Sequence, residues 1–531
     1  MRKYILLAAF LPSICFAQSV PQMDRRVTLE GPTGLNWALS TKVDTLNGTL
    51  NSPEISGGDI SNSSISGGTS AKQEINQPTI SDGTAIGLDV SSALGKVLGA
   101  SVSRYLNSKL LDIISVRDFG AKGDGVTDDT AAINAAISYA HTTNNKGGRI
   151  FFPDGVYNVS STIILTGSGF SLIGTSPRAA TIQSTVTSGN IIQIGQSPDN
   201  LNNNQNDQIF GLNIISQNPM TSGAAIYADG VYNLKIDNVR IGENIFDGLE
   251  VENSIRSTYG VMIHHLWLAS ILDKGIIIGA LAQTQQQVVT DVFLSDSMIL
   301  PAGSSAICGV CLYGAGGFYA SGVDITSNGD SHFINAMHIK PNAGSDVNAV
   351  MLSRFLMDDS TDENLLLDGD GFIADVTLTN VWASTSNTAS GIVINNTNTD
   401  GFTISGSTVD SNAQNGITIN GGVNISVSSS RILNNSMSSN GSFNGIAVGV
   451  QTGKTSPASY SITDNQIGNG GFFNLNGGSP SIIHQKWGIN IDKLSGQGFV
   501  VTNNRGFGNV SGIINDQTTG TNKTVSGNVS G

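Results

Sequence analysis

The 531-residue sequence contains few charged and few aromatic residues. Charged residues make up 12% of the chain, where about 25% is usual for globular proteins, and aromatic residues make up 6%. Helical bundles and coiled coils depend on charged faces, so this composition disfavours both. The 26 basic against 40 acidic residues leave a net charge of −14. The chain therefore lacks the positive charge needed for sequence-independent binding to a phosphate backbone, and nucleic acid is not expected as a partner.

Cysteine and long apolar runs are also scarce. Cys15 lies in an N-terminal leader, which leaves only Cys308 and Cys311. Zinc would need a second pair of ligands, so no metal site is expected. On an extended strand, three residues at ~3.3 Å each separate the Cα atoms of these two cysteines by about 10 Å, beyond disulfide reach unless the strand bulges. Buried free thiols are the favoured interpretation. No apolar run after the leader reaches the ~20 residues that span a bilayer.

Three segments precede the main part of the chain. Residues 1–17 have a basic start, an apolar run and a small-residue end, which predicts a secretory signal and a secreted, periplasmic or cell-surface protein. Residues 18–88 are rich in Ser, Gly and Asn, which favours either a flexible stalk or a segment that winds with identical copies in an oligomer. Residues 89–112 have apolar side chains every three to four positions, which predicts an amphipathic helix.

What the sequence has in abundance is glycine, at 64 residues, together with Asn, Ser and Thr. Beyond residue 220, short strands of Gly and aliphatic residues recur at spacings between 25 and 34 residues. Strands of three to five residues joined by Gly and Asn turns are typical of a parallel β-helix, whose successive turns, or rungs, stack about 4.8 Å apart. Asn residues at the corners suit stacked side-chain amides. We expect an all-β chain with one parallel β-helix over residues 113–531.

Residues 114–159 alternate between strand-like and helix-like patterns. The order is strand, glycine-rich turn, capped helix, turn and strand. Thr127 or Asp128 can cap the helix, and Asp129 favours its positive end. The Lys122-Gly123 turn lacks the Gly-Lys-Ser/Thr ending of a phosphate loop, so a turn with a cap is the favoured interpretation. The predicted buried face of this helix comprises Ala132, Ile133, Ala136 and Ile137.

This region also carries a family resemblance. The run RDFGAKGDGVTDDTAAI at 117–133, followed by GGRIFFPDGVY at 147–157, resembles the opening of the pectate-lyase-like superfamily, which includes rhamnogalacturonase-like and epimerase-like proteins and phage tailspikes. The resemblance implies a right-handed, single-stranded parallel β-helix with an N-terminal capping helix. It implies a polysaccharide partner and, through the tailspikes, a homotrimer. It does not imply a reaction, and the catalytic motifs of polygalacturonases are absent or occur in scrambled order.

Candidate catalytic aspartates come from the third strands of the middle rungs, and His332 comes from the loop at 327–335 beside them. Glycoside hydrolysis needs two carboxyl groups, about 5 to 5.5 Å apart for retention or ~6.5 to 9.5 Å for inversion, and stacked rungs supply both spacings. Asp358 and Asp410 are predicted two rungs apart, roughly 9 to 10 Å from each other. The alternative is that these are solvated turn residues. The predicted catalytic set is Asp324, Asp358, Asp359, Asp410 and His332.

Substrate binding is assigned to three further residues. His338 offers a proton carrier, Lys340 offers a cation for a substrate carboxylate, and the flat ring of Trp382 matches a pyranose face. The sequence thus predicts a secreted polysaccharide-active protein that cleaves glycosidic bonds by hydrolysis or by β-elimination. No cofactor is expected with certainty, and calcium is expected only for a lyase. The alternative is a non-catalytic carbohydrate-binding adhesin or a tailspike-like binding module.

Overall fold

The structure is a computed structural model in which two units divide between Gly87 and Leu88. It describes residues 94–95, 104–105, 112–144, 147–195, 204–254, 256–279, 288–449, 455–469, 485–496 and 498–530. The predicted signal at 1–17 and the predicted stalk at 18–88 lie outside these residues.

The helix predicted over 89–112 is wrong for the part of that segment that the structure describes. Leu94–Gly95 (β1) and Arg104–Tyr105 (β2) form an antiparallel pair of short strands. Gly95 and the β-branched residues nearby lower the helix propensity of this segment, and the periodicity of its apolar residues did not outweigh that cost. The other residues of 89–112, except Asp112, lie outside the described ranges.

The opening of the β-helix follows the predicted order of strand, turn, helix, turn and strand. The helix is α3 (Thr130–Asn144), and Ile133, Ala136 and Ile137 lie on its buried face. The Asp128 carboxylate accepts the Thr130 backbone N–H at 3.0 Å, which caps the first turn. The strands and the 3-10 helix around α3 are β3 (Ile114–Ser115), η1 (Val116–Phe119), β4 (Asp124–Asp128), β5 (Arg149–Phe152) and β6 (Gly155–Val159).

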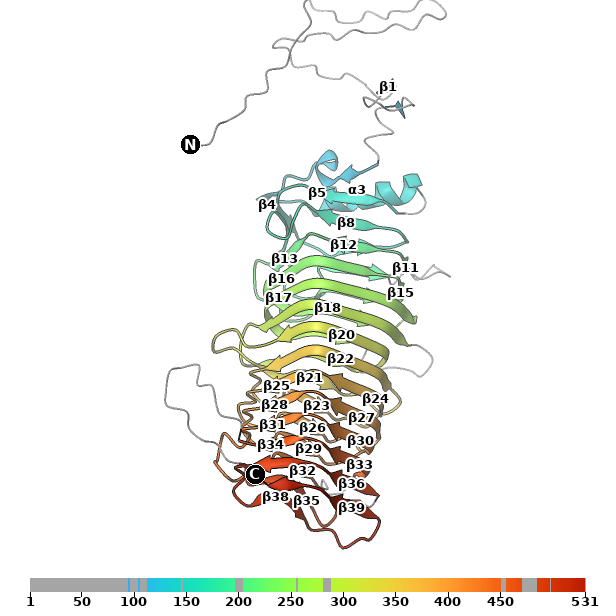
Figure 1. Cartoon of the computed structure of the whole chain (residues 1–531). Coiled ribbons are helices and arrows are strands. Elements are labelled where there is room, and N and C mark those ends of the chain that lie inside the picture. The colour runs from blue at the N-terminus through green and yellow to red at the C-terminus, as the bar shows by residue number, and fades with distance from the viewer. Residues whose placement is uncertain are drawn as a thin grey trace, which may run out of the picture. The chain divides into compact units, whose positions relative to one another are not determined.

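The main body is a right-handed parallel β-helix, in which the chain winds through three parallel sheets (Figure 1). Each strand pairs in parallel with the strand one rung later, and β16 and β17 each run through all three sheets. The first sheet comprises β7 (Ile163–Leu165), β10 (Ile192–Gly195), β14 (Ala224–Asp229), the ends of β16 (Lys235–Glu252) and β17 (Thr258–Ile278), β19 (Ala306–Leu312), β21 (Phe333–Ile339), β23 (Leu365–Leu367), β26 (Ile392–Ile394), β29 (Ile417–Ile419), β32 (Ile446–Val448), β35 (Trp487–Ile491) and β38 (Gly512–Asp516).

The other two sheets are built in the same way. The second sheet comprises β5, β8 (Ser171–Gly174), β12 (Gln208–Phe210), the starts of β16, β17, β18 (Val289–Pro301), β20 (Ala315–Ile325) and β22 (Asp346–Asp358), then β24 (Phe372–Thr379), β27 (Thr399–Ser405), β30 (Val423–Ser428), β33 (Ala458–Thr463), β36 (Phe499–Thr502) and β39 (Lys523–Ser526). The third sheet comprises β4, β6, β9 (Ala180–Ser184), β13 (Asn213–Ser216), later parts of β16, β17, β18, β20 and β22, then β25 (Trp382–Ser384), β28 (Thr408–Asp410), β31 (Arg431–Leu433), β34 (Gln466–Gly468), β37 (Arg505–Phe507) and β40 (Val529–Ser530). Two short strands, β11 (Asn204–Gln205) and β15 (Val231–Tyr232), pair at a corner.

The corner between the second and third sheets is a stack of residues with left-handed backbone. From Asn238 through Asn380 to Asn503, one residue per rung has φ between 48° and 69°. Asn and Gly tolerate this conformation, so the chain can turn sharply at this position. The alternation of inward and outward side chains begins again on the next strand. Next to this corner, Asn465 donates an amide N–H to Asn504 at 3.0 Å, and Asn504 donates to Asn528 at 2.9 Å. These bonds confirm the predicted stacking of amides at the corners.

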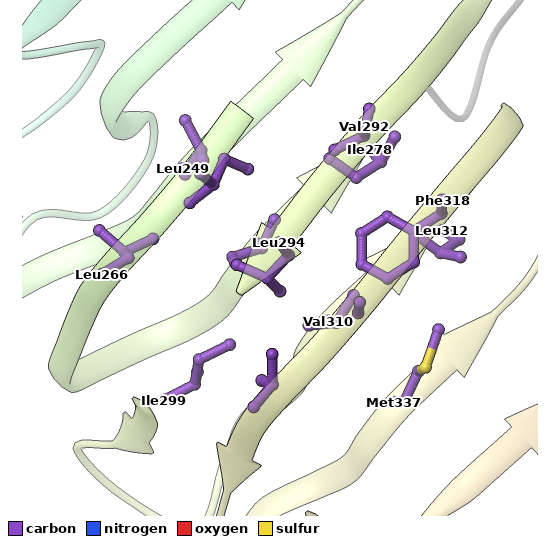
Figure 2. Packing of buried hydrophobic residues seen from close by; sticks show 14 of the residues in the cluster. Leu249, Leu266, Ile278, Val292, Leu294, Ile299, Val310, Leu312, Phe318 and Met337 are labelled. Carbon is purple, nitrogen blue, oxygen red and sulfur yellow. The ribbon is translucent and has the colours of Figure 1, made fainter. Parts of the chain in front are cut away.

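The interior of the β-helix is a stack of aliphatic side chains. In the first sheet, Leu249, Ile276, Val310, Met337 and Leu365 occupy one inward column on successive rungs, and all are fully buried. Figure 2 shows Leu249, Val310 and Met337 with neighbours from the other sheets. Because inward positions are filled, polar side chains on these strands project outward, where a ligand can reach them. None of the helices in the described part of the chain is long and apolar enough to cross a membrane.

The interpretation of Cys308 and Cys311 as free thiols is wrong. They form a disulfide bond, and their Cα atoms are 5.9 Å apart rather than about 10 Å. The strand is not fully extended here, because Gly309 turns towards the core and a Cβ on it would meet Ile325. Both sulfurs therefore lie on the outward side of β19, in a small apolar cluster with Ile277 and Tyr313.

Candidate functional site

The third sheet carries the predicted catalytic aspartates of the middle rungs. Asp358 at the end of β22, Ser384 in β25 and Asp410 in β28 occupy one outward column on successive rungs. Asp358 and Asp410 therefore lie two rungs apart, as predicted. Asp324 in β20 lies in the neighbouring column, one rung before Leu356. Burial raises the pKa of Asp324, and the nearby charge of Asp358 raises it further.

A hydrogen-bonded chain links Trp382 to this column. The indole N–H of Trp382 donates to Ser384 Oγ at 2.7 Å, and the Ser384 hydroxyl donates to Asp358 Oδ1 at 2.6 Å. Asp410 accepts from the Asn434 amide at 3.0 Å. Burial raises the pKa of Asp358 and that of Asp410. Trp382 nevertheless keeps 41% of its surface exposed, so its ring is held in place with one part facing solvent.

Asp359 and His332 form a separate pair at the corner next to Asp358. His332 Nδ1 lies 3.0 Å from the Asp359 carbonyl oxygen and 3.3 Å from its carboxylate. Asn387 donates to the same carboxylate at 3.1 Å. Asp359 has φ of 61° and occupies the corner position that Thr385 fills on the next rung. These contacts stabilise the corner.

His338 and Lys340 lie on a different sheet from the aspartates. His338 projects from β21 in the first sheet, where its Nε2 lies 2.8 Å from Asp368 Oδ1. Lys340 Nζ lies 3.9 Å from Asp368 Oδ2. The predicted site is thus divided between two faces, with the aspartates and Trp382 on the third sheet and His338 and Lys340 at the first.

The first sheet also carries a dense group of carboxylates that sequence reasoning missed. We call the outward residues of β14, β16 and β17 in this sheet the carboxylate face. Tyr227 and Glu250 are register partners on successive rungs, as are Asp247 and Lys274. The same column runs from Glu250 through Ile277 and Cys311 to His338. The carboxylate face comprises Tyr227, Asp229, Asp247, Glu250, Glu252, Asp273 and Lys274.

The side chains of the carboxylate face contact one another. The Tyr227 hydroxyl donates to Glu252 Oε2 at 2.8 Å, and Glu252 is hydrogen-bonded to Glu250. The Lys274 backbone N–H donates to Asp247 Oδ1 at 3.1 Å, and Lys274 Nζ lies 3.8 Å from the same oxygen. Lys274 also forms an ion pair with Asp273. Asp229 is fully buried below Tyr227 and accepts from Ser254.

This crowding shifts the acidities of the group. Burial raises the pKa of Asp247 from 3.8 to about 7, although Lys274 opposes the shift. Burial also raises the pKa of Glu250, and the charges of Glu252 and Asp247 add to that effect. Burial and the charges of Glu252 and Asp229 raise the pKa of Tyr227 above its usual range, so its hydroxyl keeps its proton. Strongly perturbed carboxyl groups on one face are typical of catalytic sites.

An apolar floor joins the carboxylate face to His338. It consists of Ile277, Tyr313 and the disulfide between Cys308 and Cys311. Burial raises the pKa of Tyr313, and the charges of Asp273, Asp247 and Asp368 contribute to the shift. The charges that affect the pKa of Tyr313 therefore come from the carboxylate face on one side and from Asp368, beside His338, on the other. Within the described ranges, no group of three or more His, Cys, Asp or Glu side chains has the arrangement to hold a metal ion.

The sequence contained a weak signal for the carboxylate face. Glu250 and Glu252 alternate with Leu249 and Val251, which indicates a strand with two acidic residues on its outward side. Alternation of this kind is also that of an ordinary solvated strand. Only the register of β14 against β16, which places Tyr227 beside Glu250, distinguishes the two.

The three parallel sheets, the left-handed corners and the stacked Asn amides define a right-handed parallel β-helix protein. Residues 113–300 match the model of the family described as Rhamnogalacturonase A/epimerase, pectate lyase-like. This match confirms the resemblance inferred from residues 117–157, and the matched segment contains the carboxylate face.

Three similar proteins define the extent of the likeness. Alginate lyase 7 of Azotobacter vinelandii is 59% identical over 46 residues, which are 9% of this chain and 5% of that protein. Glucan 1,3-beta-glucosidase of Cochliobolus carbonum is 33% identical over 159 residues, 29% of this chain and 18% of that protein. The crystal structure of tailspike protein 3 of bacteriophage CBA120 aligns with a TM-score of 0.58 and 16% identity over 82% of this chain and 64% of that chain. The chain thus spans only a small part of the two curated relatives, and the likeness to the tailspike is one of fold.

Proposed function

We propose that this protein hydrolyses glycosidic bonds of an extended polysaccharide at the carboxylate face. The observation that carries the proposal is the cluster of Asp247, Glu250 and Glu252 on neighbouring outward positions, where burial raises the pKa of Asp247 and that of Glu250. A general acid works best when its pKa lies near the working pH, and burial raises the pKa of Glu250 to about 8. The polysaccharide class is supported by the family match and by the names of the two curated relatives.

In the proposed reaction, Glu250 donates its proton to the glycosidic oxygen of the leaving sugar. Water attacks the anomeric carbon, and Glu252 accepts a proton from that water, which requires that the bound substrate and water separate Glu252 from its hydrogen bond to Glu250. The glycosidic C–O bond breaks and a C–O bond to the water oxygen forms. Tyr227 holds Glu252 through the 2.8 Å hydrogen bond and, because it keeps its own proton, acts as a donor rather than as a base.

The charges on this face favour an uncharged substrate at the point of cleavage. Each of the cations Lys274 and Lys340 lies beside a carboxylate, and His338 contacts Asp368. A polyuronate would therefore meet more negative than positive charge here. Among the binding residues that the sequence predicts, His338 and Lys340 lie at the same sheet, beyond the apolar floor, and we propose that they bind the polysaccharide there.

β-Elimination is the second candidate, and Lys340 and His338 on the same face are the observation that favours it. It would require a uronate substrate, and we propose calcium as the cation that would neutralise the uronate in that case. Cleavage at Asp358 and Asp410, with Asp324, Asp359 and His332 beside them, is the alternative location. The rung spacing of Asp358 and Asp410 supports that location.

The test is an assay of the mature chain against soluble polysaccharides, with new reducing ends and unsaturated uronyl ends followed together. Hydrolysis predicts reducing ends without unsaturation, and Glu250→Gln should abolish them while Asp358→Asn retains them. Unsaturated ends would establish a lyase instead. Activity lost in Asp358→Asn but kept in Glu250→Gln would move the site to the third sheet. No shortening of any polysaccharide, with retention on one of them, would favour a binding module.

The location and assembly of the protein belong to the same proposal. An enzyme acting on long polysaccharides meets them outside the cytoplasm, and the leader at residues 1–17 supports export. We propose a homotrimer in which residues 18–88 wind together. Sedimentation of the mature chain and of a chain that begins at residue 89 tests this, since only the longer chain should be trimeric.

A further inference from the structure

The third sheet presents two exposed tryptophans in a single column. Trp267 and Trp382 project from it four rungs apart, and on the rungs between them lie Met298, Asp324 and Leu356. The exposed fractions are 44% for Trp267, 40% for Leu356 and 41% for Trp382. With rungs about 4.8 Å apart, the two rings lie roughly 19 Å from each other along the β-helix axis. We call this column, together with Asp358 and Ser384 beside it, the tryptophan track.

The polar groups of the tryptophan track stand beside its rings. Ser384 receives the Trp382 indole N–H at 2.7 Å and donates to Asp358 at 2.6 Å, so the ring and the carboxylate are held side by side. The charge of Asp358 helps to raise the pKa of Asp324, so the two carboxyl groups lie near each other. A flat apolar surface next to carboxylate acceptors matches a pyranose ring, which has an apolar face and hydroxyl donors around its edge.

The charge of the track decides which polymer suits it. Between Trp267 and Trp382 the column contains Asp324 and no lysine or arginine, and Asp358 adds a second carboxyl group alongside. Two arginines lie at its margin: Arg240, one rung before Trp267, forms an ion pair with Glu243, and Arg354 donates to Ser321. A polyanion would bring like charge to this surface, whereas sugar hydroxyls would donate to the carboxylates. The proposed cleavage site lies on the first sheet, so the chemistry assigned to that face makes no use of Trp267 or Trp382.

We propose that the tryptophan track is a non-catalytic binding site for an uncharged, extended segment of polysaccharide that runs along the β-helix axis. This inference rests on the proposed function for the class of ligand. It assigns Asp358 and Trp382 to holding the polymer rather than to cleaving it. A second site at a distance from the cleavage site raises the local concentration of polymer, because binding at one site makes the other effectively intramolecular.

The experiment measures retention of the mature Glu250→Gln protein in gels containing either laminarin, a neutral glucan, or alginate, a polyuronate. Trp382→Ala and Trp267→Ala should each weaken laminarin binding about tenfold, since aromatic faces contribute strongly to such contacts. Met351→Ala is the matched control, because Met351 is 50% exposed on the second sheet and lies outside the track. It should bind like the parent.

The outcomes separate this inference from the proposed function. Unchanged laminarin binding in both tryptophan variants would overturn the track, even if the parent chain cleaves polysaccharide. Equal binding of alginate and laminarin would also overturn it, because the charge argument would fail. Weaker binding in the variants, with no cleavage by the wild type, would support the binding role of the tryptophan track and contradict the proposed hydrolysis. If Trp382→Ala lowers the sedimenting mass instead, the surface contacts another copy of the chain and the track is wrong.

Discussion

The carboxylate face and the tryptophan track are built from the same kind of strand, yet they differ in chemistry. On the carboxylate face, acidic residues contact one another and Tyr227, and burial raises the pKa of Asp247 and that of Glu250. On the track, Asp358 accepts a hydrogen bond from the neutral Ser384 hydroxyl beside the exposed ring of Trp382. Crowded carboxylates favour proton transfer, whereas separated ones beside an aromatic ring favour binding.

The largest effect on the cleavage rate is expected for Glu250→Gln, on the carboxylate face. Glu250→Gln keeps the size of the side chain but cannot donate a carboxyl proton, so the rate of cleavage should fall by about 10² to 10⁴. Asp358→Asn should change the rate less than about tenfold and instead weaken binding. Initial rates of reducing-end formation, with thermal unfolding as a control for folding, measure both. Equal losses in the two variants would mean that the faces do not differ in role.

Removal of the Tyr227 hydroxyl should have the next largest effect. Tyr227→Phe leaves the ring in place but deprives Glu252 of its donor at 2.8 Å. A hydrogen bond to a charged group contributes about 1.5–3 kcal/mol, so the cleavage rate should fall by roughly ten- to hundredfold. The unfolding temperature should stay close to that of the wild type. A rate equal to that of the wild type would exclude Tyr227 from positioning Glu252.

The pH dependence of stability distinguishes the two faces through Asp247. Its pKa is about 7 in the folded chain and about 3.8 when exposed, so the folded state binds a proton that the unfolded state releases between those values. Its contribution to stability is therefore complete below about pH 4 and is lost as the pH rises towards and through 7. The slope is at most about 1.4 kcal/mol per pH unit.

Asp247→Asn tests that linkage. Denaturant unfolding at pH 5 and at pH 8 should show a smaller loss of stability in the variant than in the wild type. The activity of the wild type should also decline above pH 7, as the carboxylate face loses its protons. Identical pH dependence in the two proteins would mean that Asp247 is not protonated in the folded chain.

The smallest effect concerns the bond that holds Trp382. Ser384→Ala removes the acceptor of the indole N–H and the donor to Asp358. Binding of laminarin should weaken by a few-fold, because the ring gains freedom that binding must remove. The cleavage rate at saturating substrate should not change. A fall in that rate, with binding intact, would place Asp358 in catalysis after all.

Local pattern was sufficient to predict much of the β-helix and part of its surface. The repeat spacing, the Asn corners and the opening at residues 117–157 led to the rungs, the amide ladders and α3. The column of Asp358 and Asp410 followed from counting rungs. The segment at 89–112 shows the limit of this reasoning, because apolar periodicity indicated a helix where Leu94–Gly95 and Arg104–Tyr105 pair as strands. Periodicity reports which faces are apolar, and short strands with turns can satisfy that requirement as well.

The sequence by itself determined the fold class, because each rung repeats a local pattern of strand and corner that is read residue by residue. Only the tertiary structure decided which outward side chains meet. Tyr227, Glu250, Ile277, Cys311 and His338 are separated by more than a hundred positions from first to last, and they form one column because the register between successive rungs aligns them. The bend at Gly309 that joins the two cysteines has the same origin. Inward positions are fixed by burial, whereas the acidity of an outward carboxylate depends on neighbours one rung away, which no local pattern specifies.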